Sequence, residues 1–369
     1  MLEQCEKCAK LSDCCLSCVD SVECKSFESA YKLDLDLTGY KLKFYGGLYG
    51  AAVGDALGVS SEFKGRELFK LSPVLEMRGH GTHDQPLGAW SDDTSLSLCL
   101  VDALAKGYSL DRLAHNMVKW YSEPYTYKTT HKIFDVGGTT REAILNIVLE
   151  KPFNECGSKL KSSNGNGSLM RMLPLVFYTD LRNDDKFKLI DEISSLTHAH
   201  YLSRFACWFY VVYASYLYRE YGIDKCVALR KTIDYIKMFM PLHFEKSEVL
   251  DIEKEFQTIL ESHIEGSLLT DFGFCSSEYI SGSGYCVDTL KAAIWCLLTS
   301  HDYKSCVLKA VNLGEDTDTT ACVAGGLAGI YYGFMDIPER WVGLLERPKY
   351  LYKLFHKFET YLDSHKEEV

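Results

Sequence analysis

The sequence predicts an all-α protein of a dozen or so helices, and three observations support this prediction. From about Tyr40 onward, apolar residues recur at helical spacing between short polar or glycine-rich turns. Strand-like alternation of apolar and polar residues is almost absent. Only eight prolines occur among the 369 residues, and several lie between the helical patterns, at Pro73, Pro86, Pro338 and Pro348.

Apolar periodicity and the turns between periodic segments place the helices in order along the chain. We expect them at Phe44–Leu57, Asp92–Ala105, Asp111–Ser122, Thr139–Val148, Ser168–Tyr178, Phe187–Leu196, Leu202–Tyr221, Lys225–Met240, Ser247–Ser262, Val287–Thr299, Lys304–Asn312, Asp318–Tyr332 and Tyr350–Asp363. Phe44–Leu57 and Asp318–Tyr332 are rich in glycine and alanine. Small residues let helix backbones approach closely, so we expect both helices in the centre of the bundle.

Six of the fifteen cysteines lie in the first 24 residues, as two tandem copies of C-x2-C-x5-C. Paired C-x2-C elements are typical half-sites of a structural zinc ion. We therefore consider a zinc site at Cys5, Cys8, Cys15 and Cys18. The gap from Cys8 to Cys15 is short for such a module, and a disordered or disulfide-prone tail is the alternative. Residues 1–38 are predicted to be a Cys-rich extension of the main domain.

Composition and charge exclude several classes of protein. The net charge is −11 and no basic tract is present, which argues against nucleic acid and anionic membranes as partners. The most apolar stretch, residues 207–218, is too short to span a bilayer, and no secretory signal is visible. Cysteines such as Cys99 and Cys322 lie in apolar helical patterns and indicate a reducing compartment. We expect a cytoplasmic monomer.

Two acidic runs are the main chemical signal: residues 91–95 (SDDTS) and 315–320 (EDTDTT). Each precedes a helical pattern, where Asp, Ser and Thr are common caps. A cap uses one side chain, however, whereas each run places two aspartates in one turn. Like charges that close repel unless a cation lies between them. If the two runs converge, they form an oxygen-only cage suited to Mg²⁺, Mn²⁺ or Ca²⁺.

Seven sequence blocks occur in order between about residues 45 and 345. They are residues 50–63 (GAAVGDALG, then SEF), 90–95 (WSDDTS), 135–141 (DVGGTTR), 164–171 (NGNGSLMR), 197–200 (THAH), 284–290 (GYCVDTL) and 312–319 (NLGEDTDT). Together these blocks resemble the ADP-ribosylglycohydrolase family, which includes the enzyme that removes ADP-ribose from dinitrogenase reductase. On this basis residues 39–369 are expected to form an ADP-ribosylglycohydrolase-like helical domain.

The resemblance implies an orthogonal multi-helix bundle with a central cleft that holds two divalent ions, Mg²⁺ or Mn²⁺. By motif position it implies as metal ligands Ser91, Asp92, Asp93, Asp316, Asp318 and Thr319, with Asp318 shared between the ions. Two positions depart from the family pattern. Ser91 stands where Thr is more common, which keeps the hydroxyl, and Glu315 stands where Gly is frequent. The added charge of Glu315 either repels substrate phosphates or points to solvent.

ADP-ribose suits such a centre, because its vicinal ribose hydroxyls can bridge two hard cations about 3.5–4 Å apart. Hydrolysis of its glycosidic bond passes through an oxocarbenium-like state, and metal-bound water is acidic enough to attack. We expect Glu62 to act as the general base, with Asp93 as the alternative. An equally weighted alternative is that Glu62 has a structural role, as a buried carboxylate that is hydrogen-bonded to a helix end.

A polar loop that runs into a helix is predicted to bind the diphosphate through its backbone N–H groups. This loop comprises Ser163, Asn164, Gly165, Asn166, Gly167 and Ser168. His198 is a candidate hydrogen-bond partner of a ribose hydroxyl, and Tyr285 a candidate to stack on adenine, although capping or core roles are common for both residue types. His80 and His83 are not expected to be ligands, because their nitrogens suit an oxygen cage poorly.

The leading hypothesis is a divalent-metal-dependent hydrolase that releases ADP-ribose from a modified protein or a small conjugate. A non-catalytic ADP-ribose-binding protein on the same fold is the first alternative. A magnesium-dependent phosphohydrolase is the second, but no basic residue lies within either acidic run to neutralise a transferring phosphoryl group. The sequence leaves open which linkage is cut, because all such substrates share the same ADP-ribose half.

Overall fold

The computed structural model describes residues 39–130, 132–178, 187–262, 264–265, 268–269 and 275–365. The predicted Cys-rich extension, with Cys5, Cys8, Cys15 and Cys18, lies outside the described residues. Tyr40–Val369 forms one compact unit. Its only strands in the described ranges are β1 (Ile264–Glu265) and β2 (Leu268–Leu269), which pair antiparallel with Ile264 opposite Leu269. The prediction of an all-α fold is confirmed.

Helices follow one another along nearly the whole described chain. The α-helices are α2 (Tyr40–Gly58), α3 (Arg66–Leu71), α4 (Asp92–Leu104), α5 (Leu110–Ser122), α6 (Gly138–Val148), α7 (Phe153–Cys156), α8 (Leu175–Tyr178), α9 (Phe187–Ser195), α10 (Tyr201–Arg219), α11 (Lys225–His243), α12 (Lys246–Glu255), α13 (Gln257–Leu260), α14 (Cys286–Leu298), α15 (Tyr303–Val311), α16 (Thr317–Tyr332), α17 (Glu339–Leu344) and α18 (Pro348–Ser364). The 3₁₀ helices are η2 (Gly81–His83), η3 (Lys161–Ser163), η4 (Leu169–Arg171), η6 (Ser277–Tyr279) and η7 (Phe334–Asp336). Within these ranges no helix has the length and apolarity needed to cross a membrane.

Two predicted helices are each divided in the structure. The segment expected as Ser168–Tyr178 is a 3₁₀ turn, η4, followed by the short α8, and Pro174 lies between them, where it has no N–H to continue a helix. The segment expected as Ser247–Ser262 breaks at Phe256, whose φ of −101° and ψ of 14° leave the helical region. The short helices α3, α7 and α17 were not predicted, because four to six residues carry too little periodicity to identify.

The two glycine- and alanine-rich helices, α2 and α16, pack against each other in the core, as expected. Every fourth residue of α2 on the facing side is glycine: Gly46, Gly50, Gly54 and Gly58. A Cβ added to Gly54 would lie 2.0 Å from the carbonyl oxygen of Ala321, and one added to Gly50 would lie 2.4 Å from that of Gly325. The backbones therefore touch directly, and this contact sets the position at which α16 begins.

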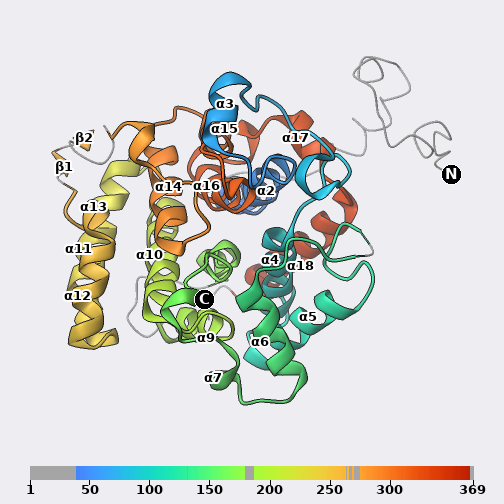
Figure 1. Ribbon diagram of the computed structural model, residues 1–369, viewed down its shortest axis with the longest axis horizontal. Helices are drawn as coiled ribbons and strands as arrows, with labels where there is room; N and C mark the ends of the chain where they lie inside the picture. Colours follow the sequence, from blue (N-terminus) through green and yellow to red (C-terminus); the bar gives the residue numbers. More distant parts are fainter. Residues whose placement is uncertain are drawn as a thin grey trace. The chain divides into compact units, whose positions relative to one another are not determined.

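The other helices surround this central pair. The neighbours of α16 include α4, α10, α14 and α15, and the neighbours of α10 include α9, α11 and α12. Figure 1 shows α16 beside α2 and α15, with α11 and α12 beyond α10 and away from the central pair. The starts of α4 and α16 therefore both lie within the packed interior.

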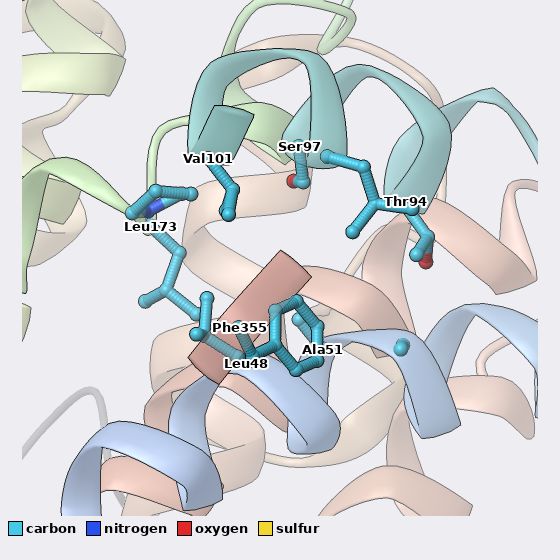
Figure 2. A pocket seen from close by; sticks show the side chains of 10 residues that line it. Leu48, Ala51, Thr94, Ser97, Val101, Leu173 and Phe355 are labelled. Carbon is cyan, nitrogen blue, oxygen red and sulfur yellow. The ribbon is translucent and has the colours of Figure 1, made fainter. Parts of the chain in front are cut away.

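A small cavity remains in the core between α2, α4 and α18 (Figure 2). It is lined by Leu48, Ala51, Ala52, Thr94, Ser97, Leu98, Val101, Leu173, Pro174 and Phe355. Its volume of about 10 Å³ leaves room for one water molecule at most. A nucleotide cannot fit there, so this cavity is a packing gap and not the substrate site.

Asp102 of α4 pairs with two lysines and a tyrosine around this helix. Its carboxylate accepts hydrogen bonds from Lys106 at 2.7 Å, from Lys357 of α18 at 2.9 Å and from Tyr127 at 2.9 Å. Burial favours the neutral acid, but these donors outweigh it and lower the pKa of Asp102 below its usual value. A carboxylate with a depressed pKa stabilises the fold above its unfolded pKa, and this contribution is lost as the pH falls through the folded pKa.

We expect Asp102→Asn to lower the free energy of unfolding by about 1–2 kcal/mol at pH 7, because both lysine ammonium groups lose their partner. The difference from wild type should shrink between pH 7 and pH 2, because the wild-type carboxylate is protonated as the pH falls through its depressed pKa. Urea unfolding at the two pH values measures this. Glu253→Gln, at an exposed position of α12, is the control and should change little at either pH. An equal destabilisation by Asp102→Asn at both pH values would contradict this interpretation.

Candidate functional site

The two acidic runs meet in the interior. Ser91 is the N-cap of α4, and its Oγ donates to Asp93 Oδ2 at 2.8 Å. Thr319, in the first turn of α16, donates its Oγ1 to the same oxygen at 3.2 Å. Asp93 and Asp318 are both completely buried. The convergence on which the predicted metal cage depends is therefore present in the structure.

Asp55, in the fifth turn of α2, is a site residue that the residue patterns did not reveal. Its carboxylate accepts from the backbone N–H of Ser91 at 2.9 Å, and from the N–H and hydroxyl of Thr94 at 3.0 and 2.5 Å. It therefore holds the start of α4 against α2. Asp55, Asp93 and Asp318 each place one carboxylate oxygen within 4.8 Å of the others, an arrangement that could hold a metal ion.

A second cluster lies next to the first and shares Asp318 with it. Its other members are Glu62, His83 and Asp135, and one ligand atom of each lies within 4.8 Å of the others. His83 Nε2 forms a hydrogen bond with Glu62 Oε2 and lies 3.8 Å from Asp135 Oδ1. Glu62 was predicted, whereas His83 was not expected at the centre and Asp135 had no assigned role. His80 is exposed and pairs with Asp84 at 2.8 Å, apart from both clusters.

The electrostatics of the clusters favour a cation. Burial raises the pKa of Asp92, Asp93 and Asp318 well above the usual value, and the neighbouring carboxylates raise it further. The pKa of Glu62 is also raised, by burial first and then by Asp135.

At the starts of α4 and α16, three buried carboxylate oxygens have no hydrogen-bond partner among the described residues: Asp93 Oδ1, Asp316 Oδ1 and Asp318 Oδ2. Both helix starts therefore contribute buried oxygens that accept no hydrogen bond. Such carboxylate oxygens are the ligands that a divalent cation prefers. The residues present therefore fit a metal centre.

The predicted diphosphate loop lies beside this centre. Asn166 Nδ2 donates to Asp316 Oδ2 and to Thr289 Oγ1, both at 2.9 Å. The loop also pairs with the segment before α14: Asn166 N donates to Gly284 O, and Cys286 N donates to Asn164 O, each at 3.0 Å. This pairing brings Tyr285 next to the loop. The structure therefore brings the acidic run of α16 together with the predicted nucleotide-binding residues.

Several predicted substrate-binding side chains are already engaged within the protein. Asn164 contacts Lys161 O, His200 Nδ1 and Ser203 Oγ, and Ser168 Oγ contacts Cys207 and Ser194 in the core. Ser163 Oγ pairs with Ser158 Oγ at 2.9 Å, and Tyr285 donates to Glu255 at 3.4 Å. The side chains of Asn164 and Ser168 thus shape the loop, and a ligand would meet its backbone and its glycines.

His198 lies directly beneath this loop. A Cβ added to Gly167 would lie 2.9 Å from His198 Cε1. Burial, together with the positive charge of Arg171, lowers the pKa of His198 to about 3. The imidazole is therefore neutral at physiological pH, and it is placed where a ligand on the loop would meet it.

Comparison with known proteins identifies first the fold and then the family. A solved structure titled "ADP-ribosylglycohydrolase-related protein complex" matches with a TM-score of 0.68 and 27% identity, covering 88% of this chain and 99% of that chain. The sequence model of the ADP-ribosylglycohydrolase family matches residues 37–367. The chain belongs to the ADP-ribosylglycohydrolase family, and it is therefore a hydrolase of that class.

Curated relatives agree with this assignment. ADP-ribosylarginine hydrolase Tri1 of Serratia proteamaculans is 30% identical over 305 residues, 82% of this chain and 75% of the relative. The ADP-ribosyl-[dinitrogen reductase] glycohydrolase of Rhodospirillum rubrum is 29% identical over 307 residues, 82% and 89% of the two chains. Human ADP-ribosylhydrolase ARH3 is 24% identical over 341 residues, 81% and 88% of the two chains.

Glu315, the residue that departs from the family pattern, has a left-handed backbone with φ of +63°. Its N–H donates to Lys64 O at 2.8 Å and its carbonyl accepts from Phe63 N at 2.6 Å, which ties the Glu62 turn to the start of α16. Its side chain is exposed. The frequent glycine at this position is explained by the backbone conformation, because a Cβ is strained there.

We expect Glu315→Gly to raise the free energy of unfolding by about 1 kcal/mol, since it relieves this strain. The matched control is Glu142→Gly, at an exposed position inside α6, which should lower it by about 0.5–1 kcal/mol. Thermal unfolding of both variants gives the sign of each change. Destabilisation by both substitutions would show that the Glu315 backbone is not strained.

Proposed function

We propose that this protein hydrolyses the glycosidic bond between ADP-ribose and an arginine side chain of a protein, with two divalent cations at the centre. The observation that supports this most is that two clusters share Asp318, next to three buried carboxylate oxygens for which the described residues provide no hydrogen-bond donor. The non-catalytic alternative is disfavoured because Asp92, Asp93, Asp316 and Asp318 are all present and the two runs converge.

Mg²⁺ or Mn²⁺ would be held by the two clusters, with Ser91, Asp92, Asp316 and Thr319 beside them. When bound, such cations orient the vicinal ribose hydroxyls and acidify water. Asn166 orients Asp316 through its side chain. Because the backbone N–H of Asn166 donates to Gly284 O, we assign the N–H groups of Gly165 and Gly167 to the diphosphate. These residues position the anomeric carbon at the acidic centre.

Glu62 is the better candidate for the general base. Asp93 Oδ2 already accepts hydrogen bonds from Ser91 and Thr319, and Asp93 Oδ1, which has no partner among the described residues, is better used as a metal ligand. Glu62 Oε2 forms a hydrogen bond with His83, and Asp135 lies close by. Burial, and then the neighbouring Asp135, raise the pKa of Glu62, which favours proton uptake. In the proposed step, Glu62 accepts the proton of the attacking water as the bond to the leaving group breaks through an oxocarbenium-like state.

The surroundings of Glu62 fit a guanidinium leaving group. The centroid of the His83 ring lies 5.8 Å from that of Phe63 and 5.3 Å from that of Phe134, and Asp135 is close by. Aromatic faces and carboxylates together bind a planar cation well. The Serratia relative is named an ADP-ribosylarginine hydrolase, which supports the same linkage.

The test is ADP-ribose release from an ADP-ribosyl-arginine peptide, with Mg²⁺ and after EDTA treatment, beside a serine-linked peptide. We expect turnover of the arginine peptide that stops with EDTA and returns with added Mg²⁺. Turnover that persists in EDTA would contradict the proposed role of the cations. Binding of ADP-ribose without turnover would favour the non-catalytic alternative, and release of inorganic phosphate from ADP-ribose would favour a phosphohydrolase.

The zinc site of the extension, the monomeric state and the cytoplasmic location stay predictions. We propose one zinc ion held by Cys5, Cys8, Cys15 and Cys18, because thiolates prefer zinc to magnesium. Metal analysis of the purified full chain measures the zinc content per chain directly. One zinc per chain that is lost in Cys8→Ser supports the proposal, and a zinc-free chain purified under reducing conditions contradicts it.

A further inference from the structure

A buried chain of hydrogen bonds connects Arg171, Thr197 and His198. Arg171 Nη2 donates to Thr197 Oγ1 at 2.8 Å, and Thr197 Oγ1 lies 2.8 Å from His198 Nδ1. Arg171 and Thr197 have no exposed surface, and His198 is 2% exposed. Solvent therefore does not complete the hydrogen bonding of the Thr197 hydroxyl.

The direction of the second hydrogen bond follows from the number of hydrogens. Arg171 has only donors, so it occupies a lone pair of Thr197 Oγ1. If His198 Nδ1 also donated, the hydroxyl hydrogen of Thr197 would need another acceptor, and the described residues provide no third partner for it. A buried donor without an acceptor is costly. The Thr197 hydroxyl must therefore donate to Nδ1, and the ring proton then lies on Nε2.

The Nε2 edge of His198 faces the glycine loop. A Cβ added to Gly167 would lie 3.3 Å from Nε2, and one added to Gly165 would lie 3.8 Å from it. Nε2 has no hydrogen-bond partner in the part of the chain that the structure describes, whereas Nδ1 is bonded to Thr197. The free ring nitrogen therefore lies on the side of the loop where a ligand would bind.

We propose that Arg171 and Thr197 are positioning residues that fix His198 as its neutral Nε2–H tautomer and so present a hydrogen-bond donor to the Gly165–Gly167 loop. The ligand atom that it meets must be an acceptor, such as a ribose or phosphate oxygen. The identity of this ligand rests on the proposed function. The tautomer does not, because it follows from contacts within the protein alone.

The tautomer is measured by ¹⁵N NMR of histidine-labelled, EDTA-treated protein without ligand, with His198→Gln used to assign the signals. We expect the Nε2–H pattern for His198, unchanged between pH 6 and pH 8. An Nδ1–H or imidazolium pattern would overturn the proposal, even if the enzyme hydrolyses ADP-ribosyl-arginine. Conversely, a protein that does not bind ADP-ribose would overturn the proposed function and leave the tautomer assignment intact.

Thr197→Val and Thr197→Ser then test whether the Thr197 hydroxyl positions His198 for ligand binding. Thr197→Val removes the hydroxyl at similar volume, and calorimetry should show about 5- to 10-fold weaker ADP-ribose binding, the loss expected for one hydrogen bond. Thr197→Ser keeps the hydroxyl and should remain within about twofold of wild type. Wild-type affinity for ADP-ribose in a folded Thr197→Val protein would overturn the positioning role of Thr197.

A second pair of variants covers the case in which Thr197→Val fails to fold. The amide of Gln at position 198 reaches the place of Nε2 with a donor, whereas Leu has none. His198→Gln should therefore bind ADP-ribose at least about threefold more tightly than His198→Leu. Equal affinities of these two variants would contradict a donor at Nε2.

Discussion

Asp318→Asn is expected to abolish turnover, by more than about a hundredfold, because changes in residues that only support metal ligands already cost 10- to 100-fold. Asp318 contributes an oxygen to both clusters, so the substitution weakens both at once. The same change should stabilise the metal-free protein by about 1–3 kcal/mol, since it removes one buried negative charge from among several others. A substitution that raises stability and removes activity is characteristic of a charged functional site.

Two measurements separate these effects. Steady-state hydrolysis of the ADP-ribosyl-arginine peptide gives the loss of activity, and thermal unfolding in EDTA and in MgCl₂ gives the stability. Mg²⁺ should raise the wild-type midpoint and leave that of Asp318→Asn unchanged. Glu315→Gln removes the same charge from an exposed position nearby and should behave as wild type. Asp318 would not serve both cation sites if Asp318→Asn retained a tenth of the activity, or if Mg²⁺ raised its unfolding midpoint as much as that of wild type.

Gly54→Ala is expected to cause a large loss of stability, because the added methyl group would clash with the backbone of α16. Its Cβ would lie 2.0 Å from the Ala321 carbonyl oxygen and 2.6 Å from the carbonyl carbon, both backbone atoms that cannot rotate away. Overpacking typically costs about 1–3 kcal/mol, and we expect at least the upper end here, because two helix backbones must separate. Asp55 follows Gly54 directly, so Mg²⁺ affinity should fall as well.

Urea unfolding of Gly54→Ala gives the free energy, and calorimetric titration with Mg²⁺ gives the affinity. Gly65→Ala is the matched control: no atom of the described residues lies within 4 Å of its added Cβ, and its φ of −69° suits alanine. It should change the free energy of unfolding by less than about 0.5 kcal/mol. A Gly54→Ala protein as stable as Gly65→Ala would mean that α2 and α16 do not touch as described.

Much of the centre could be predicted because its signals are local. Two aspartates in one helical turn, as at Asp92 and Asp93, exceed the needs of capping, and this excess indicates the correct pair of helix starts. The small residues of α2 and α16 likewise predict a close contact between the two helices, which the glycine positions of α2 confirm. These features depend on neighbours in sequence, which is why residue patterns reveal them.

The remaining site residues depend on tertiary contacts. Asp55 is a single carboxylate in a buried helix, and its role follows only from its bonds to Ser91 and Thr94. Asp135 lies on a loop and His83 ends the 3₁₀ helix η2. Both reach Asp318 only through the fold, and no spacing rule connects them. The sequence also does not reveal that the Asn164 side chain points inward, because its partners His200 and Ser203 are distant in sequence.

The central claim is that Asp318 joins two cation sites, and a crystal structure of the Mn²⁺-loaded protein with anomalous diffraction data tests it most directly. We predict two anomalous peaks about 3.5–4 Å apart, each within about 2.5 Å of an Asp318 carboxylate oxygen. One peak should lie against Asp55 and Asp93 and the other against Glu62 and Asp135. A single peak, or two peaks neither of which contacts Asp318, would contradict this account.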